Sequence, residues 1–198
     1  MANITAALVS ELRARTSVGM MDCKKALVEC DGDMDKACDY LREKGLAKAA
    51  KKAERTASQG KMFTYVHSNA KLAVLLELDC ETDFVARTDE FNKLGHEIAM
   101  HIAASNPTYI TPEEVPADVI EHEKQVIIAQ AREEGKPEKM LEKIAEGRIN
   151  KFYEENCLME QKYVRDPEVK IKDLVIENIA KIGENIIVRR YARFMIEG

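Results

Sequence analysis

The chain has 198 residues, of which 45% are hydrophobic and 33% are charged, and its formal net charge is −5. This composition is typical of one or two folded domains and excludes a disordered chain. The acidic balance argues against nucleic acid as a partner, because nucleic-acid-binding proteins usually carry a clear positive excess. The five cysteines form no Cys-x-x-Cys pair, which favours free thiols over a disulfide framework or a zinc site.

The sequence contains neither a membrane-spanning segment nor a phosphate-binding loop. No apolar run has the length of a membrane span, and Met1–Thr5 lack the basic segment and apolar stretch of a secretion signal. We therefore expect a cytoplasmic protein without a membrane contact. The glycine-rich loops Gly-x-x-x-x-Gly-Lys-Ser/Thr and Gly-x-Gly-x-x-Gly, which cradle phosphates, do not occur. We therefore expect no cofactor and no direct binding of nucleotide or nucleic acid.

Residues 3–44 show three apolar stripes at helical spacing, which begin at Ile4, Ala26 and Met34. They predict a bundle of three short helices, with Asp33 as the N-cap of the third. The Ala- and Lys-rich segment 44–61 that follows predicts a partly helical linker. We place an N-terminal domain at residues 1–52, including the start of this linker, and a core domain at residues 53–198.

The core domain opens with a predicted β-hairpin. Lys61–His67 and Lys71–Asp79 are extended runs separated by a short polar turn. In the second run, apolar residues from Leu72 to Leu78 alternate at period two, which predicts a strand with one buried face. Helical spacing then returns and predicts a helix from about Thr88 to Ser105.

Helices dominate the predicted remainder, until a last strand. Thr111–Glu114 resembles a capping box with proline at the first helical position, so a short helix is expected there. Longer helices are predicted at 118–134, which Gly135 ends, at 137–156, and at 169–182, which Gly183 ends. An alternating strand is predicted from Ile186 to Ile196. The predicted fold is therefore α+β: a three-helix bundle, a linker, and a core in which helices pack on a small antiparallel sheet.

The junction between the second strand and the next helix is an acidic turn, Cys80–Arg87, that carries one large aromatic residue, Phe84. Junctions of this kind can hold out binding groups on a rigid scaffold. On the residues alone two interpretations stay open. Phe84 is either presented to a partner or packed back beneath the turn, as aromatic residues beside apolar strands usually are.

No catalytic set of residues is recognisable. His96 and His101 superficially resemble a zinc-protease pattern, but a spacing of five turns them about 140° apart on a helix, which removes a shared metal face. No Ser/His/Asp or Cys/His set can be nominated from the sequence. We therefore expect a protein that is not an enzyme and holds no metal.

Two segments, Arg15–Leu27 and Glu81–Arg87, resemble the bacterial translation elongation factor Ts family. The resemblance is close from Ile4 to about Ile102 and again from Lys151 to Gly198. It implies that the N-terminal bundle has the ubiquitin-associated fold and that the core is the dimerisation domain. The chain departs from the family at Ser17-Val18, where Gly-Ala is usual, and in lacking a second core half and a coiled-coil insertion. Short members of the family are similar in forming dimers, so we expect a homodimer.

The resemblance also implies a function, namely guanine nucleotide exchange on elongation factor Tu, the GTPase that delivers aminoacyl-tRNA. Thr82, Asp83, Phe84 and Val85 match the segment that enters the partner near its bound magnesium ion and nucleotide phosphates. Met20 and Met21 match a loop that contacts the partner's nucleotide-binding domain. Burial of at least one of these methionines in the bundle is the alternative. An exchange factor of this kind needs no chemical step.

Two other functions stay open. The N-terminal bundle would suit a non-enzymatic adaptor for helical or ubiquitin-like targets, but this interpretation leaves the Phe84 turn without a role. An RNA-binding accessory factor would use the lysines of segment 44–61, but no aromatic residues accompany them and the chain is acidic.

Overall fold

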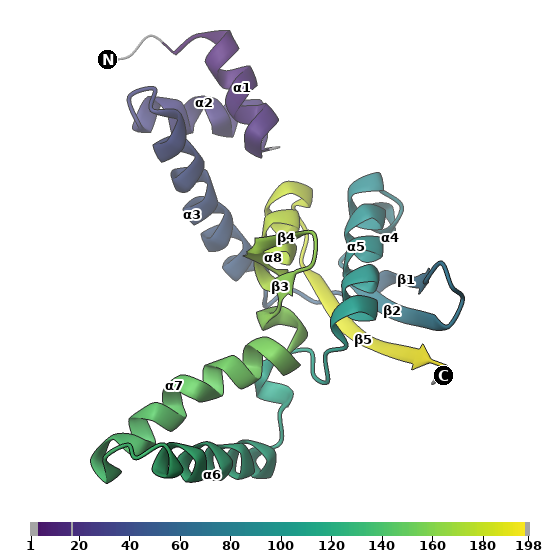
Figure 1. Cartoon of the computed structure of the whole chain (residues 1–198). Helices are drawn as coiled ribbons and strands as arrows, with labels where there is room; N and C mark the ends of the chain where they lie inside the picture. Colours follow the sequence, from purple (N-terminus) through teal and green to yellow (C-terminus); the bar gives the residue numbers. More distant parts are fainter. Residues whose placement is uncertain (1–3, 17, 197–198) are drawn as a thin grey trace. The chain divides into compact units, whose positions relative to one another are not determined.

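The computed structural model describes residues 4–16 and 18–196. Ser17, one of the two residues at which the sequence departs from the family pattern, lies outside this range. The chain divides into two compact units, each assembled from three stretches of sequence. Figure 1 labels the helices and strands named below. The first unit comprises Met1–Met62, Glu77–Gly95 and Asp173–Arg189, and the second comprises Phe63–Leu76, His96–Lys172 and Arg190–Gly198.

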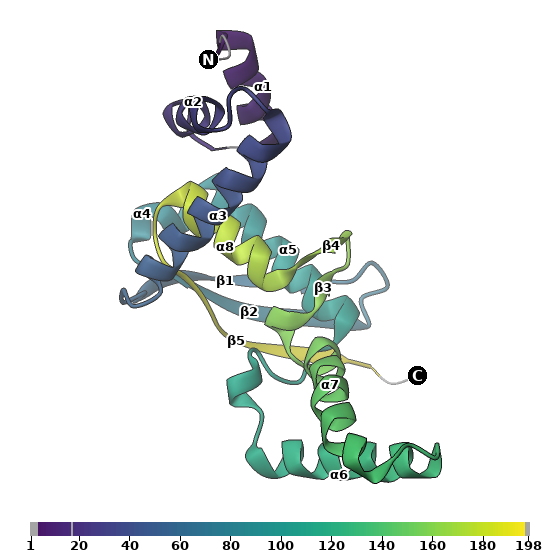
Figure 2. The same cartoon turned by 90° about the vertical axis from the view of Figure 1, so that its left-hand side faces the viewer.

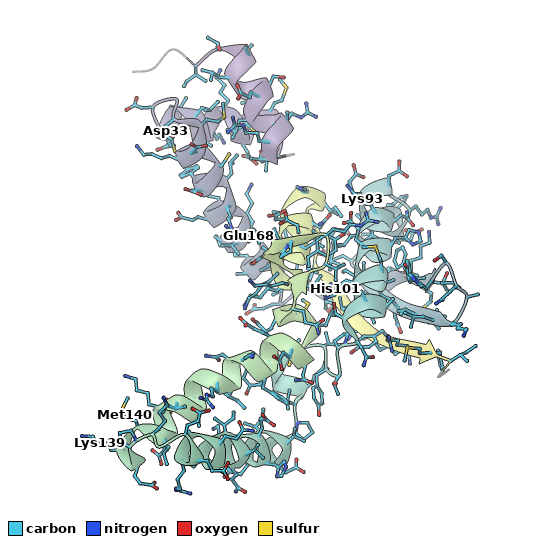
Figure 3. All side chains as sticks on the ribbon, in the orientation of Figure 1. Asp33, Lys93, His101, Lys139, Met140 and Glu168 are labelled. Atoms are coloured by element: carbon cyan, nitrogen blue, oxygen red, sulfur yellow. The ribbon has the colours of Figure 1, made fainter. Side chains whose placement is uncertain are left out.

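The first unit begins with the predicted bundle. Its helices are α1 (Ala6–Thr16), α2 (Met20–Glu29) and α3 (Met34–Lys52). Their apolar stripes meet in one core, formed by Val9, Leu12, Cys23, Ala26, Leu27, Ala37 and Leu41. Asp33 caps α3, because its side chain accepts a hydrogen bond from the Lys36 N–H at 3.1 Å (Figure 3). The three-helix bundle and its cap are therefore confirmed.

The third helix is longer than the predicted bundle, since α3 continues through the start of the Ala- and Lys-rich segment to Lys52. Ala and Lys are strong helix formers, and Ala49 is buried, so both propensity and packing extend the helix. The predicted linker is thus helical in its first half. The division into residues 1–52 and 53–198 stays a prediction.

A three-stranded antiparallel sheet follows, in the order β1-β2-β5. Its strands are β1 (Gln59–Val66), β2 (Leu72–Cys80) and β5 (Ile186–Met195). The hairpin between β1 and β2 is closed by a hydrogen bond from the His67 N–H to the Leu72 carbonyl at 2.8 Å. Val74, Leu76 and Leu78 are buried on one face of β2, as their alternation predicts. The α+β fold is therefore confirmed.

In the second unit, side chains of β5 attach to the end of the helix α5 (Asp89–Ser105). The Tyr191 hydroxyl donates to the Pro107 carbonyl at 2.7 Å, and the Arg193 Nε donates to the Ala103 carbonyl at 3.1 Å. Burial raises the pKa of Tyr191 to about 12, so the phenol stays a donor at neutral pH. These two hydrogen bonds place the side chains of Tyr191 and Arg193 on the face of β5 that is directed toward α5.

The second unit also contains a helical hairpin, α6 (Ala117–Glu133) and α7 (Glu138–Asn156), shown in Figure 2. Ile127 of α6 packs against Ala145 and Ile149 of α7. Gly135 has a φ of +75° and ends α6, as predicted, because glycine adopts the left-handed region without strain. Both helices lie within a residue or two of their predicted bounds.

Two local predictions were wrong. Pro112–Glu114 is a 3₁₀ turn, η1, and the Thr111 side chain does not cap it. The Glu114 carboxylate instead accepts a hydrogen bond from the Ile110 N–H at 2.9 Å. The helix α8 (Ile171–Ile182) begins later than predicted, because the preceding residues form a strand.

That strand is β4 (Asp166–Lys170), which pairs antiparallel with β3 (Lys162–Tyr163). The sequence did not predict this second hairpin, since strands this short show no clear alternation. A further short element, the 3₁₀ turn η2 (Leu158–Glu160), joins α7 to β3.

A buried histidine connects this region of the second unit to α5. His101 Nε2 lies 2.9 Å from Gln161 Oε1, and the Val164 N–H donates to His101 Nδ1 at 3.3 Å (Figure 3). These partners suit a neutral ring protonated on Nε2, and burial lowers the pKa of His101. His96, by contrast, lies edge-on to the Phe63 ring. Each of the two histidines thus has its own packing partners within the second unit.

Candidate partner-binding site

The predicted turn is a single turn of helix, α4 (Asp83–Ala86), placed directly after β2. Thr82 is its N-cap, and the Thr82 Oγ1 accepts a hydrogen bond from the Val85 N–H at 3.4 Å. Thr88 plays the same part for α5, since its Oγ1 accepts from the Phe91 N–H at 3.3 Å. Two threonine caps therefore delimit the turn, one on each side.

Phe84 projects from this turn with 79% of its surface exposed. Ala86, the last residue of the turn, is by contrast buried. The interpretation in which Phe84 packs back as a core residue is therefore wrong. An exposed aromatic side chain on a fixed backbone is a typical anchor for a partner pocket.

The other predicted residues of the turn have different environments. Asp83 is exposed and pairs with Arg87 one turn later, with Oδ2 and Nη2 at 2.7 Å. Asp83 does not cap the following helix, because that position belongs to Thr88. Val85 is partly buried, and its carbonyl accepts from the Thr88 hydroxyl at 2.8 Å. Phe84 is thus the only large apolar side chain that the described turn exposes.

The start of the turn is held by a carboxylate that is distant in sequence. Glu184 Oε2 accepts hydrogen bonds from the backbone N–H groups of Glu81 at 3.1 Å and Thr82 at 3.0 Å. Glu184 Oε1 accepts from the Thr82 hydroxyl at 2.7 Å. Hydrogen bonds to an ionised carboxylate are shorter and stronger than neutral ones.

A second set of contacts runs in the opposite direction. Glu81 Oε1 accepts from the Asn185 N–H at 2.7 Å, and its Oε2 lies 3.6 Å from Arg55 Nη1. The Asn185 side chain is buried and donates to the carbonyls of Arg55 at 2.8 Å and Ala53 at 3.3 Å. Segments 53–55, 81–82 and 184–185 are therefore joined in one polar cluster.

Sequence reasoning missed the contributions of Glu184 and Asn185 to this site. Thr82 and Glu184 lie 102 residues apart, and no local pattern links them. Only the neighbouring Gly183 gave a signal, as the predicted end of α8. Its φ of +92° redirects the chain immediately before Glu184.

The thiol nearest the turn is structural. Cys80 is fully buried and its Sγ donates to the Thr82 carbonyl at 3.1 Å. Burial, followed by the nearby Glu184 charge, raises the pKa of Cys80 to about 11, so the thiolate is scarce at neutral pH. Burial likewise raises the pKa of Cys157 to about 11.

Met20 and Met21 open α2, immediately after Gly19. They are 51% and 68% exposed, whereas the next apolar residue of the helix, Cys23, is buried in the bundle core. The alternative in which at least one of the two methionines is buried is therefore wrong. Flexible thioether side chains at this position suit an adaptable apolar contact.

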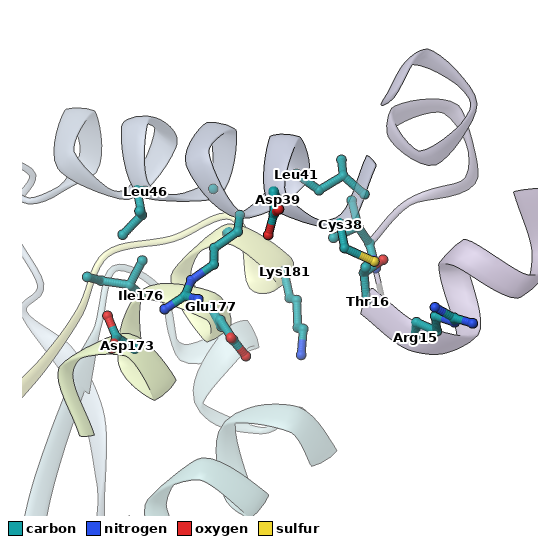
Figure 4. A pocket seen from close by; sticks show the side chains of 14 residues that line it. Arg15, Thr16, Cys38, Asp39, Leu41, Leu46, Asp173, Ile176, Glu177 and Lys181 are labelled. Carbon is teal, nitrogen blue, oxygen red and sulfur yellow. The ribbon is translucent and has the colours of Figure 1, made fainter. Parts of the chain in front are cut away.

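The first unit also contains a cavity of about 330 Å³ (Figure 4), lined by residues of α1, α3 and α8. Leu46 and Ile176 contribute apolar surface, while Arg15, Glu177 and Lys181 contribute charge. None of the predicted site residues lines it. Within residues 4–16 and 18–196, no three His, Cys, Asp or Glu side chains form a group that could hold a metal ion. No helix among these residues is long and apolar enough to cross a membrane.

Comparisons with known proteins all point to one family. The family model described as "Elongation factor TS" matches residues 22–178. A protein named elongation factor Ts from Thermoanaerobacter sp. (strain X514) is 59% identical over 191 residues, which cover 96% of this chain and 94% of that protein. A protein of the same name from Caldanaerobacter subterraneus is 58% identical, and the match covers 96% of each chain. Another, from Fervidobacterium nodosum, is also 58% identical, and the match covers 98% of each chain.

Proposed function

Because the chain belongs to the elongation factor Ts family, and is therefore a translation elongation factor, we propose that it is the guanine nucleotide exchange factor of elongation factor Tu. The observation that carries the proposal is Phe84, a large apolar side chain held 79% exposed on a capped turn. A monomeric protein gains nothing from such exposure, whereas a partner pocket would bury the ring.

In the proposed mechanism, the turn enters elongation factor Tu beside its nucleotide. Phe84 supplies the apolar contact, and the exposed carboxylate of Asp83 perturbs the surroundings of the magnesium ion and phosphates. Thr82 and Val85 flank these two residues in the turn and help to hold its backbone in place. The exchange factor binds nucleotide-free elongation factor Tu more tightly than the GDP-bound form. By linkage, it lowers the affinity of elongation factor Tu for GDP by the same ratio by which GDP lowers the affinity of elongation factor Tu for the exchange factor.

Met20 and Met21 form a second contact in this proposal. Their exposed side chains bind the nucleotide-binding domain of elongation factor Tu and hold the factor on its partner. This contact contributes to affinity in all nucleotide states, whereas the Phe84 contact distinguishes between them. The protein therefore acts in the cytoplasm as a binding partner and not as an enzyme, since exchange breaks and forms no covalent bond.

We also propose that the protein is a homodimer. In the second unit the sheet exposes apolar side chains on the face opposite its buried side, at Val66 of β1 and Leu75 of β2. Phe194 and Ile196 are exposed too, and alternate with Tyr191 and Arg193, whose side chains attach to the end of α5. A second copy of the chain would cover this apolar surface.

The deciding experiment uses purified components. Elongation factor Tu loaded with fluorescent GDP is mixed with excess unlabelled GDP, and release is followed with and without this protein. We expect release to accelerate in proportion to the concentration of the factor until the complex saturates. Unchanged release would refute the proposal. In that case, binding of elongation factor Tu that GDP does not weaken would favour the adaptor function.

A further inference from the structure

We propose that Glu184 is a positioning residue for nucleotide exchange: its carboxylate holds the turn so that Phe84 points outward in one fixed orientation. This inference rests on the proposed function, and in it Glu184 acts through the turn. The carboxylate uses both oxygens, accepting from two backbone N–H groups and from the Thr82 hydroxyl at 2.7–3.1 Å.

The exposed ring of Phe84 cannot fix its own direction, because a side chain that is 79% exposed makes few packing contacts. Its direction is set by the backbone of α4, which is four residues long. A helix of one turn is not stable alone, since nucleating it fixes several dihedral angles for very few hydrogen bonds. The turn therefore depends on restraints at its two ends.

The restraint at the far end is local in sequence. The Thr88 hydroxyl and N–H both donate to the Val85 carbonyl, at 2.8 and 3.0 Å, and α5 continues directly from there. The restraint at the near end is Thr82. Its hydroxyl accepts from the Val85 N–H while donating to Glu184, so Glu184 sets the orientation in which Thr82 caps α4.

Glu184 is itself held firmly. Gly183, in the left-handed region, donates its N–H to the Ile179 carbonyl at 2.9 Å and ends α8 immediately before Glu184. Asn185 follows with only 2% of its surface exposed and is bonded to Glu81 and to the carbonyls of segment 53–55. The carboxylate is thus presented from a fixed backbone, which is what a positioning residue requires.

The test compares Glu184→Ala and Glu184→Gln in the fluorescent-GDP assay, with rates measured against the concentration of elongation factor Tu loaded with GDP. We expect Glu184→Ala to lower kcat about tenfold, the size expected from losing hydrogen bonds to a charged group. We expect KM to change by less than about twofold, because Met20 and Met21 still bind the partner. Glu184→Gln should retain most of the rate, since its carbonyl oxygen can still accept from the two N–H groups.

A double-mutant cycle with Phe84→Ala separates positioning from general stability. If Glu184 acts through Phe84, then Glu184→Ala should lower kcat by less than about twofold when Phe84 is already absent. A merely structural role would lower the folded fraction and would reduce the rate equally in both backgrounds. All rates are taken at a temperature where circular dichroism shows that each variant is folded.

Glu114→Ala is the matched control. Glu114 is another carboxylate that accepts a backbone hydrogen bond, from Ile110 at 2.9 Å, but it is exposed and belongs to the second unit. Its replacement should leave kcat unchanged. A folded Glu184→Ala protein with normal kcat, or one whose loss is undiminished in the Phe84→Ala background, would overturn the inference alone. A normal kcat for Phe84→Ala itself would remove the role of Phe84, and this inference with it, but would leave the exchange function standing; only a failure of the unchanged protein to accelerate GDP release would overturn the proposed function.

Discussion

Arg189 of β5 donates a hydrogen bond from Nε to Asp79 Oδ2 of β2 at 2.7 Å, which ties the two strands together next to the residues that lead into the Phe84 turn. The two partners have unequal environments. Asp79 is buried, whereas the Arg189 side chain is about half exposed and also donates from Nη2 to the Ala57 carbonyl at 3.2 Å. Loss of one partner should therefore cost more than loss of the other.

We expect Arg189→Ala to lower the free energy of unfolding by about 2–3 kcal/mol, because it leaves a buried carboxylate without its charged partner. Asp79→Asn should cost only about 1 kcal/mol, since the amide oxygen can still accept from Arg189, and the half-exposed guanidinium stays in contact with water. Urea unfolding of both variants measures the difference. Equal losses, or a larger loss for Asp79→Asn, would contradict this account of the pair.

Gly60 in β1 provides a second test of the same region. A Cβ at this position would lie 2.5 Å from the Leu78 carbonyl oxygen and 2.8 Å from Asp79 Cα. Backbone atoms cannot rotate away, so Gly60→Ala should separate β1 from β2 and cost about 1–3 kcal/mol of stability. Thermal melts followed by circular dichroism measure this loss.

Gly147→Ala is the control for Gly60→Ala. Gly147 lies inside α7, and a Cβ there meets nothing within 4 Å. The same substitution should raise stability by about 0.5–1 kcal/mol, because alanine favours the helix. If both variants were destabilised equally, the cost at Gly60 would not come from the close approach of the strands.

Phe84→Ala tests the presented aromatic. Since the ring is exposed, its removal should change the melting temperature little, while stimulated GDP release falls about tenfold, equivalent to about 1.4 kcal/mol of lost preference for the nucleotide-free partner. The fluorescent-GDP assay and thermal melts are run on the same protein preparations.

Phe63→Ala is the matched comparison for Phe84→Ala, because Phe63 is an aromatic residue of the same size that is almost completely buried. Its removal should cost about 3–5 kcal/mol of stability. The two substitutions should therefore have opposite profiles. If the Phe84→Ala protein were destabilised but still stimulated GDP release normally per folded molecule, Phe84 would have no role in the exchange mechanism.

Stability should depend on pH through His101. Burial lowers the pKa of His101 in the folded protein, so the unfolded chain binds the proton more readily. The contribution to stability is therefore present above the unfolded pKa, near 6.5, and is lost as the pH falls below about 6.5 toward the lower folded pKa. Urea unfolding at pH 7.5 and at pH 5.5 should show a decrease in stability at the lower pH.

His101→Gln should be less stable at pH 7.5 but should show a smaller decrease between the two pH values. His122→Gln, at an exposed position of α6, is the control and should keep the pH dependence of the unchanged protein. If His101→Gln kept the full decrease, other groups would be responsible for it.

The proposed homodimer predicts a sedimentation coefficient above that of a 22.4 kDa monomer at micromolar concentration. Phe194→Asp should shift the protein toward monomer, because a charge would replace an exposed apolar side chain of the sheet face. Val164→Asp, at an exposed apolar position outside that sheet, should leave the association unchanged. A protein that sediments only as a monomer would exclude the dimer under these conditions.

The elements that could be predicted from the sequence are those whose signals are local. Alternation from Leu72 to Leu78 predicted β2 because a strand with one buried face needs apolar residues at period two. Asp33 and Gly135 marked helix ends because a cap and a left-handed residue act on adjacent backbone groups. At residues 44–52 two signals competed: the charged composition favoured a linker, whereas the helix propensity favoured a continued helix. The helix propensity prevailed, and α3 continues to Lys52.

The arrangement around the site required the tertiary structure. The sequence placed Phe84 on a turn between a strand and a helix, but its exposure depended on what lies around that turn. The turn is held by Glu184, whose carboxylate accepts a hydrogen bond from Thr82, 102 residues away in sequence. Hydrogen bonds of this kind follow from the path of the whole chain, since α8 and β5 must first bring Glu184 to the end of β2. For this reason the residues fixed the chemistry of the turn, whereas only the folded chain decided that its aromatic side chain faces outward.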